Sequence, residues 1–387
     1  MPVRTETRSA ALFERARTVL PGGNTRTTLF VPPHPPYAAY GEGYELVDVD
    51  GRRVIDLHAN YTALVHGHAH PALVAEATEA VREGSCFGLP TEAEVELAEA
   101  LCGRVAPLER VRFTNSGTEA VMMAIRAARA ASGRPGLLRF EGAYHGTYDA
   151  VATETSPGVP DGVGADVGVV PFDDETAFLA ALDDRGDQLA CVLLDLMPNR
   201  VGLRRASESF ARLVREETRR REIVLIVDEV ITFRLSYGGI QERYGIEGDL
   251  VTFGKVIGGG FAIGAFGGRT DLMAAFDPTE PGHVPHGGTF SANPVATRAG
   301  LAALRLLDRA AIDRANMLGE RLRSELAKLG LETAGRGSLL QVGVELADWW
   351  RLYEAGVLVT PNGLAAVSTV MDDAVIDEVV ARFARAI

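Results

Sequence analysis

The alternation of short apolar runs with longer helical segments constrains the fold of this chain more than any other feature. The apolar runs that predict strands are residues 111–114, 137–140, 190–194 and 223–227. Helical spacing begins at Thr118, after the first run, and recurs at residues 210–221, before the last. Because parallel strands need a long crossover, usually a helix, this rhythm predicts an α/β core with a mainly parallel sheet.

Both ends of the chain depart from this pattern and predict a second, smaller part. Two short apolar runs flank Asp50-Gly51, a dipeptide typical of a hairpin turn. After Asn293-Pro294 a helical region is followed by short strands and a last helix. The expected parts are an N-terminal segment that joins the small domain (residues 1–60), a large domain (61–292) and a C-terminal small α+β domain (293–387).

Charge and cysteine content restrict the functional class. Acidic residues outnumber basic residues by 52 to 39, which gives a formal net charge of −13. Since nucleic-acid backbones select basic surfaces, this balance argues against a nucleic-acid partner. The three cysteines are too scattered for a metal or redox motif, and their low number is typical of a reducing compartment. No apolar run predicts a signal peptide or a membrane span, so we expect a cytoplasmic protein with no membrane partner.

A lysine and an aspartate carry the most specific chemistry. Lys255 lies in the glycine-rich stretch Phe253-Gly254-Lys255-Val256-Ile257-Gly258-Gly259-Gly260, and Asp228 ends an apolar run upstream of it. An amine can hold the aldehyde of pyridoxal phosphate as a Schiff base, and a carboxylate against the ring nitrogen keeps that nitrogen protonated. Each residue alone has an ordinary explanation, as a solvated charge or a helix start. The pair gains weight from the motifs around it.

Three further motifs lie where predicted strands turn into helices or loops. Asn115-Ser116-Gly117-Thr118-Glu119-Ala120 offers backbone N–H groups and hydroxyls, which attract a phosphate at a helix N-terminus. Glu141-Gly142-Ala143-Tyr144-His145-Gly146 places an aromatic ring and an imidazole after the next strand, where the ring can stack on a planar cofactor. Gly287-Gly288-Thr289-Phe290-Ser291-Ala292-Asn293-Pro294 is another hydroxyl-bearing turn. Plain helix caps and a structural loop are the alternatives.

Together these motifs resemble those of the class III aminotransferases, which belong to the fold-type-I (aspartate-aminotransferase-like) pyridoxal-phosphate enzymes. Further matches occur at residues 21–26, 67–71 and 85–91, so the resemblance runs nearly end to end. Within the family the chain is most similar to the subgroup of glutamate-1-semialdehyde aminomutases and β-amino-acid (β-phenylalanine-type) aminotransferases. The resemblance implies a large domain that binds pyridoxal 5′-phosphate and a homodimer with shared active sites.

The resemblance also implies roles for individual residues. Lys255 forms the Schiff base and shuttles a proton, and Asp228 pairs with the ring nitrogen. The other residues expected at the cofactor are Ser116, Gly117 and Thr118 at its phosphate, and Tyr144, His145 and Val230 around its ring. Thr289 is expected to reach the phosphate in the neighbouring subunit.

Three residues are expected to contact the substrate. Arg26 matches an arginine that grips a substrate carboxylate in this subgroup, and Tyr61 falls where the aminomutases carry a tryptophan. Arg200 lies in Asp195-Leu196-Met197-Pro198-Asn199-Arg200-Val201-Gly202, where the family usually has Glu-Pro and a Gly-Asn-type turn. The hypothesis for Arg200 is a second cation that selects a further carboxylate or polar group. Exposure to solvent is the alternative for both arginines.

Other departures weaken the aminomutase interpretation. Ala365 takes the place of an aminomutase glutamate, and the loop from His145 to Val169 looks shorter than the aminomutase gating loop. The leading prediction is therefore an aminotransferase that passes an amino group from a small-molecule amino donor to an oxo acid. The alternatives are a pyridoxal-phosphate-dependent isomerase, either an aminomutase or a racemase/epimerase, and a non-catalytic cofactor-binding relative.

Overall fold

The computed structural model describes residues 7–152 and 156–387, which form two compact units. The large unit is Ala72–Asp313, and the terminal unit combines the chain up to Pro71 with Arg314–Ile387. The boundaries expected after residues 60 and 292 fall earlier than these divisions. The helix that follows Asn293 packs within the large unit, which moves the second division toward the C-terminus.

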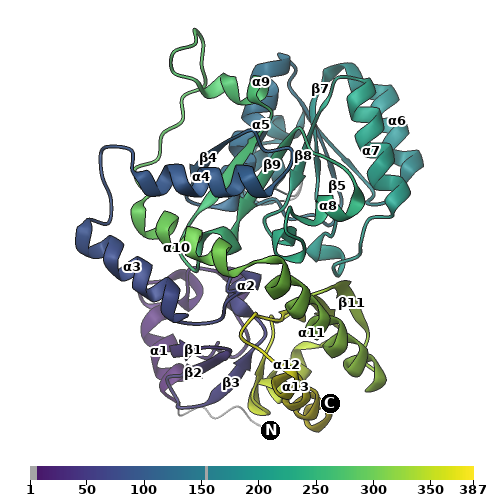
Figure 1. The fold of residues 1–387 in the computed structure, drawn as a ribbon. Helices are drawn as coiled ribbons and strands as arrows, with labels where there is room; N and C mark the ends of the chain where they lie inside the picture. Colours follow the sequence, from purple (N-terminus) through teal and green to yellow (C-terminus); the bar gives the residue numbers. More distant parts are fainter. Residues whose placement is uncertain (1–6, 153–155) are drawn as a thin grey trace. The chain divides into compact units, whose positions relative to one another are not determined.

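A seven-stranded sheet forms the centre of the large unit, in the order β4-β10-β9-β8-β7-β5-β6 (Figure 1). Its strands are β4 (Arg110–Thr114), β5 (Gly136–Phe140), β6 (Val167–Val170), β7 (Leu189–Leu194), β8 (Val224–Asp228), β9 (Leu250–Gly254) and β10 (Gly264–Gly268). β10 is antiparallel to both of its neighbours, and the other neighbouring pairs are parallel. The predicted α/β core with a mainly parallel sheet is confirmed.

The large unit also contains the helices that surround this sheet or connect its strands. They are α3 (Pro71–Glu83), α4 (Glu92–Arg104), α5 (Gly117–Ser132), α6 (Glu175–Arg185), α7 (Glu208–Arg220), α8 (Ile240–Tyr244), α9 (Thr270–Met273) and α10 (Pro294–Leu306). β7 and β8 are buried along their whole length, as expected for parallel strands covered on both faces. The alanine-rich α5 packs its buried side against β4, β7, β8, β9 and β10, which fixes the position of its N-terminus. No helix in the described part of the chain is both long and apolar enough to cross a bilayer.

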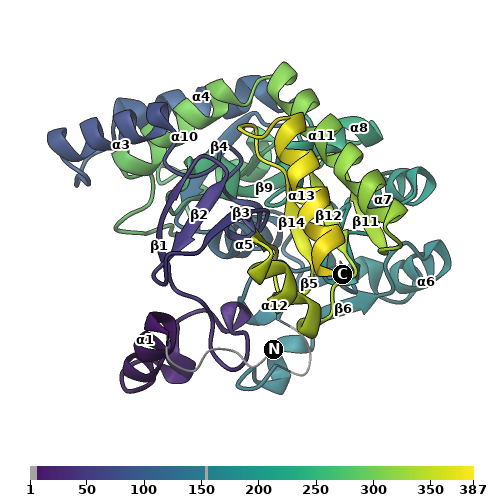
Figure 2. The same ribbon diagram turned by 90° about the horizontal axis from the view of Figure 1, so that it is seen from below.

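The terminal unit is built from both ends of the chain (Figure 2). One sheet has the order β1-β2-β3-β13 and the other β11-β12-β14. The strands are β1 (Ala38–Glu42), β2 (Glu45–Asp48), β3 (Arg53–Asp56), β11 (Thr333–Arg336), β12 (Leu339–Val342), β13 (Val357–Leu358) and β14 (Leu364–Ala366). The helices are α1 (Arg8–Arg17), α2 (Ala59–Thr62), α12 (Leu346–Glu354) and α13 (Asp373–Ala386), while α11 (Arg309–Lys328) begins in the large unit and ends here. The predicted α+β part from the two termini is therefore confirmed.

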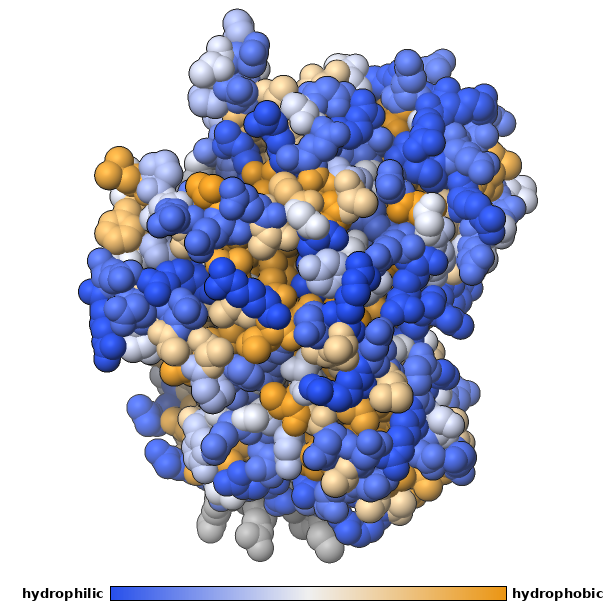
Figure 3. All heavy atoms as spheres, viewed as in Figure 1, coloured by the Kyte–Doolittle hydropathy of each residue, from blue (hydrophilic) through white to orange (hydrophobic). Residues whose placement is uncertain are grey.

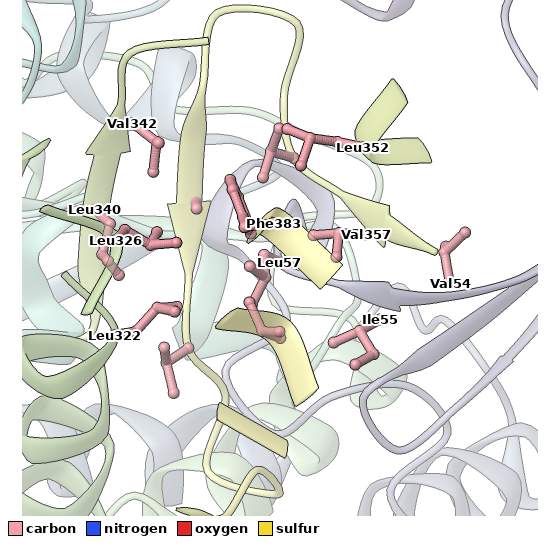
Figure 4. Close-up of a cluster of buried hydrophobic side chains, with 14 of the residues drawn as sticks. Val54, Ile55, Leu57, Leu322, Leu326, Leu340, Val342, Leu352, Val357 and Phe383 are labelled. Atoms are coloured by element: carbon pink, nitrogen blue, oxygen red, sulfur yellow. The ribbon is translucent and has the colours of Figure 1, made fainter. Parts of the chain in front are cut away.

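An apolar core joins the two ends of the chain within the terminal unit (Figure 4). Val54, Ile55 and Leu57 come from the N-terminal segment, and Leu340 and Phe383 come from the C-terminal one. All five side chains are almost completely buried. Neither end can bury these residues alone, so the terminal unit forms only when both segments are present.

Replacing Phe383 with alanine should lower the free energy of unfolding by about 3–5 kcal/mol, because the fully buried ring leaves a cavity behind. Urea titration measures the change. Arg385 on the same helix has an exposed side chain, and its replacement by alanine should change the free energy by less than about 0.5 kcal/mol. Equal losses in the two variants would contradict the place of Phe383 in this core.

Candidate active site

Asp228 and Lys255 lie at the same edge of the seven-stranded sheet. Asp228 is the last residue of β8, and Lys255 follows the last residue of β9, the parallel strand beside it. In open α/β sheets, ligands bind outside the carboxyl ends of the strands. Lys255 also adopts a φ of 50°, in the left-handed region that residues with a Cβ rarely enter. Backbone strain of this kind clusters at functional sites.

Three hydrogen bonds fix the buried carboxylate of Asp228. Its Oδ2 lies 2.6 Å from Nδ1 of His145, and its Oδ1 accepts from the backbone N–H of Val230 at 3.0 Å and the hydroxyl of Thr252 at 3.1 Å. His145 is itself buried. A carboxylate held in this way has one orientation, which suits it to pair with a protonated ring nitrogen.

A cavity of about 150 Å³ opens beside these groups. It is lined by Gly117, Thr118, Val121, Tyr144, His145, Gly146, Asp228, Val230 and Lys255. Two glycines let the lining segments approach closely, since a Cβ on Gly146 would lie 2.4 Å from Oγ1 of Thr118 and one on Gly117 would lie 3.0 Å from Val230. The structure thus brings together seven of the residues that the sequence assigned to the cofactor, and Ser116 adjoins them.

The N-terminus of α5 forms one wall of the cavity. Ser116 caps the helix by accepting a hydrogen bond from the N–H of Glu119 at 3.2 Å, and the Glu119 carboxylate accepts from the N–H of Asn115 at 2.7 Å. This reciprocal cap leaves the N–H groups of Gly117 and Thr118, at the first turn, without an acceptor inside the helix. Together with the helix dipole they form a site suited to an anion such as a phosphate.

Burial and neighbouring charges change the protonation of the groups around the cavity. Burial lowers the pKa of Lys255, although the carboxylates of Asp228 and Asp195 oppose this effect. Burial, with a further contribution from the charge of Asp228, raises the pKa of Asp195 to about 7. The amine is therefore easier to deprotonate than a solvated lysine, and Asp195 holds a proton in a pH range where an ordinary aspartate does not.

Arg26 and Tyr61 lie close to each other in the terminal unit. A guanidinium N–H of Arg26 donates to Oδ1 of Asn60 at 2.6 Å, and the Tyr61 hydroxyl donates to the Thr28 carbonyl at 2.7 Å. The Tyr61 ring meets His58 edge-on, with 4.5 Å between the ring centroids. Residues 59–62 all have positive φ, an unusual run for residues with a Cβ. The two predicted substrate residues are thus held by one strained turn, and their roles stay a prediction.

Thr289 and Arg200 lie outside the lining of the cavity. Thr289 is exposed, and its loop contacts the start of α5 through Ser291, whose Oγ lies 3.4 Å from Nδ2 of Asn115. Arg200 is exposed as well, but its guanidinium carbon lies over the Tyr144 ring, 4.7 Å from the centroid. The predicted contacts of Thr289 with a neighbouring subunit and of Arg200 with the substrate stay predictions.

Sequence reasoning assigned no role to Thr252, Val121 or Asp195. Thr252 pairs with Asp228 across β8 and β9, which depends on the strand order and register. Val121 lies one helical turn after Gly117 on α5, so the helix period could have predicted that the two residues share a face. Asp195 directly follows the buried strand β7. An aspartate at the end of an apolar run is the same signal that identified Asp228 at the end of β8, so the sequence could have indicated Asp195 as well.

Comparison with known proteins identifies the family. The class-III aminotransferase family model matches residues 33–387 of the chain. The chain belongs to the class III aminotransferases. Members of this family and its solved structures bind pyridoxal phosphate or its amine form, so pyridoxal 5′-phosphate is the cofactor and the fold is fold type I. The recognition made from the sequence motifs is confirmed.

The names of similar proteins indicate two kinds of activity. The glutamate-1-semialdehyde 2,1-aminomutase of Methanothermobacter thermautotrophicus is 43% identical over 83% of this chain and 79% of its own length. An ω-transaminase from Sphaerobacter thermophilus is 42% identical over 99% of this chain and 98% of its own, with a TM-score of 0.95. A β-phenylalanine aminotransferase from Variovorax paradoxus is 34% identical, covers 98% of this chain and 93% of its own, and has a TM-score of 0.91. The comparisons establish a class III pyridoxal-phosphate enzyme.

Replacing Asp195 with asparagine should make the stability of the cofactor-free protein less sensitive to pH. A carboxyl whose pKa is raised to about 7 in the folded chain binds its proton more tightly there than in the unfolded chain. Its contribution to stability is complete below its ordinary pKa of 3.8 and is lost as the pH rises through about 7. Between about pH 5 and pH 8, the free energy of unfolding of the wild type should therefore fall by about 2–3 kcal/mol relative to that of D195N. Urea unfolding of both proteins measures this difference, and parallel pH profiles would contradict it.

Proposed function

We propose that the chain is an aminotransferase that moves an amino group from a β- or ω-amino substrate to an oxo acid. The main support is the match to the ω-transaminase, which holds at 42% identity over nearly the full length of both chains. The β-phenylalanine aminotransferase, whose likeness covers 98% of the chain, supports the same conclusion. The short segment between His145 and β6 agrees with it, since this segment looked too short for the aminomutase gating loop.

The residues around the cavity fit pyridoxal phosphate. When bound, the cofactor supplies an electron sink for the bond that breaks at the substrate carbon. The N–H groups of Gly117 and Thr118, with the nearby Ser116, are suited to hold its phosphate. Asp228, oriented by its three hydrogen bonds, would keep the ring nitrogen protonated, and Val230 and Tyr144 would pack around the ring.

Lys255 is the group that moves the proton in this proposal. Its pKa is lowered by burial, so a larger fraction of the amine is free of its proton than in solution. A neutral amine at the cavity wall can take a proton from the substrate carbon and return it elsewhere, the task of a general base. Asp228 would assist by keeping a positive charge on the ring nitrogen.

Arg26 is the candidate for the substrate carboxylate. Its bond to Asn60 holds the guanidinium in place, and its planar fork is suited to a carboxylate. Tyr61 is fixed by Thr28 and His58 beside it, so the turn presents a cation and an aromatic ring together. A substrate that carries a carboxylate fits this pair.

A homodimer with shared active sites is part of the proposal. The large unit leaves several large apolar side chains exposed: Val74, Val81, Phe87, Leu89, Val95 and Phe290. Figure 3 shows apolar atoms exposed over α4, α10 and the segment that joins α3 to α4. Exposed apolar surface of this kind is typical of a subunit interface. The exposed Thr289 precedes Phe290, so its place suits a contact with the phosphate of a second copy.

A glutamate-1-semialdehyde aminomutase is the second candidate. It is supported by relatives with that name at up to 43% identity, among them one from Methanocaldococcus jannaschii that matches 96% of both chains at 36% identity. The aminomutase would use the same lysine and aspartate without net exchange of amino groups. A solved aminomutase at 23% identity shares the fold, which does not separate the two activities.

Incubation of the purified enzyme with single amino donors should separate these activities. The panel contains an α-amino acid, an aromatic and an aliphatic β-amino acid, an ω-amine and glutamate-1-semialdehyde. We expect a β- or ω-amino donor to change the absorbance of the bound cofactor and release one equivalent of oxo product, and an added oxo acid to reverse the change. Isomerisation of glutamate-1-semialdehyde without any oxo acid would favour the aminomutase instead.

Hybrid dimers test the shared site. Lys255→Ala removes the base, and Thr289→Glu places a negative charge where a phosphate is expected. If Thr289 serves the partner's site, a hybrid of the two variants has one site with both defects and one intact site. Random pairing should then restore about a quarter of wild-type activity in a mixture of two inactive proteins. Two affinity tags demonstrate that hybrids have formed. If the mixture then recovers no activity, Thr289 does not act across the interface.

A further inference from the structure

The turn that carries Arg200 is locked onto the loop that carries Tyr144. The backbone N–H of Arg200 donates to the carbonyl of Gly142 at 3.2 Å. Val201 fills the space beside Gly142 so closely that a Cβ there would lie 2.1 Å from Cγ1 of the valine. Two contacts on neighbouring residues therefore place the Arg200 side chain against the residues that follow Gly142.

The guanidinium of Arg200 ends on the Tyr144 ring, 4.7 Å from its centroid. Tyr144 lines the cavity at Lys255, whereas Arg200 does not, so the guanidinium contacts the ring without lining the cavity. Within the described residues, no carboxylate lies within ion-pair distance of Arg200. The Tyr144 ring is therefore the contact that the structure gives for this guanidinium.

We infer that Arg200 is a positioning residue that holds Tyr144 in the orientation needed to cover the cofactor ring. The inference rests on the proposed function, in which Tyr144 packs on pyridoxal phosphate. Tyr144 is 37% exposed and would otherwise sample several rotamers. A planar cation stacked on the outer part of the ring orders the side chain before the cofactor arrives, so less freedom is lost on binding.

Arg204 offers a matched control on the same segment. It is also exposed and also stacks on an aromatic ring, 5.3 Å from the centroid of Phe172. Phe172 does not line the cavity at Lys255. Loss of the Arg204 side chain therefore removes an arginine that lies over an aromatic ring, together with its hydrogen bond to the Phe172 carbonyl, from the same part of the protein without touching Tyr144.

The test compares R200A, R200K and R204A as cofactor-free proteins. Titration with pyridoxal phosphate gives the dissociation constant, and fluorine NMR of protein labelled with 3-fluorotyrosine, with Tyr144→Phe for assignment, reports the Tyr144 ring before the cofactor is added. R200A should weaken cofactor binding about threefold to tenfold, as expected for loss of one preordered side chain. It should also change the Tyr144 signal. R200K should recover part of the affinity because it retains the cation, and R204A should match the wild type.

Several outcomes would overturn the inference. One is unchanged cofactor affinity and an unchanged Tyr144 signal in R200A. Another is a rise in KM confined to substrates with a second carboxylate, with cofactor binding intact, which would make Arg200 a direct substrate contact. An equal loss in R204A would show a general effect on folding. Failure of the wild type to exchange amino groups would remove the proposed function, while the affinity and NMR measurements would still decide the role of Arg200.

Discussion

The active-site edge depends on holding one buried carboxylate in a fixed orientation. His145, Thr252 and the backbone N–H of Val230 give the Asp228 carboxylate hydrogen-bond partners in place of the water that burial removes. Burial, with a further contribution from the charge of Asp228, raises the pKa of the neighbouring Asp195 to about 7. Lys255 lies within electrostatic reach of both carboxylates. This arrangement directs charge to the position that a protonated ring nitrogen requires.

Close backbone approaches and strained residues build the rest of the site on this rigid sheet. Gly117 and Gly146 remove the side chains that would separate α5 from its neighbours, and Lys255 accepts a left-handed backbone at the end of β9. The run of positive φ at residues 59–62 is a second strained segment, in the terminal unit. Strain of this kind persists only where the surrounding packing holds it. The buried β7 and β8 supply that packing in the large unit, and the core that joins the two chain ends supplies it in the terminal unit.

The sequence predicted the parts of this design that depend on local patterns. Buried parallel strands are continuous apolar runs, which is why β5, β7 and β8 were evident, and Asp228 ends β8. β10 was not evident because Gly-Ala-Phe-Gly-Gly has little strand propensity. The neighbouring backbone requires glycine there instead, since a Cβ on Gly264 would lie 2.1 Å from the Ser116 carbonyl. The contact of His145 with Asp228 joins residues 83 positions apart, and strand order alone creates it. The division near residue 313 depends on the packing of α10, which no local pattern reports.

The turn from Asp195 to Gly202 is where the chain departs most from the motifs it otherwise shares with its family. Its first residue is a buried acid within electrostatic reach of Asp228, His145 and Lys255. Its sixth residue, Arg200, lies on the Tyr144 ring. One altered turn therefore acts on the charge of the site at one end and on the ring that lines the cavity at the other. Because Lys255, Asp228 and the start of α5 are unchanged, divergence here can alter how the cofactor is held and which substrate is accepted while the reaction type is retained.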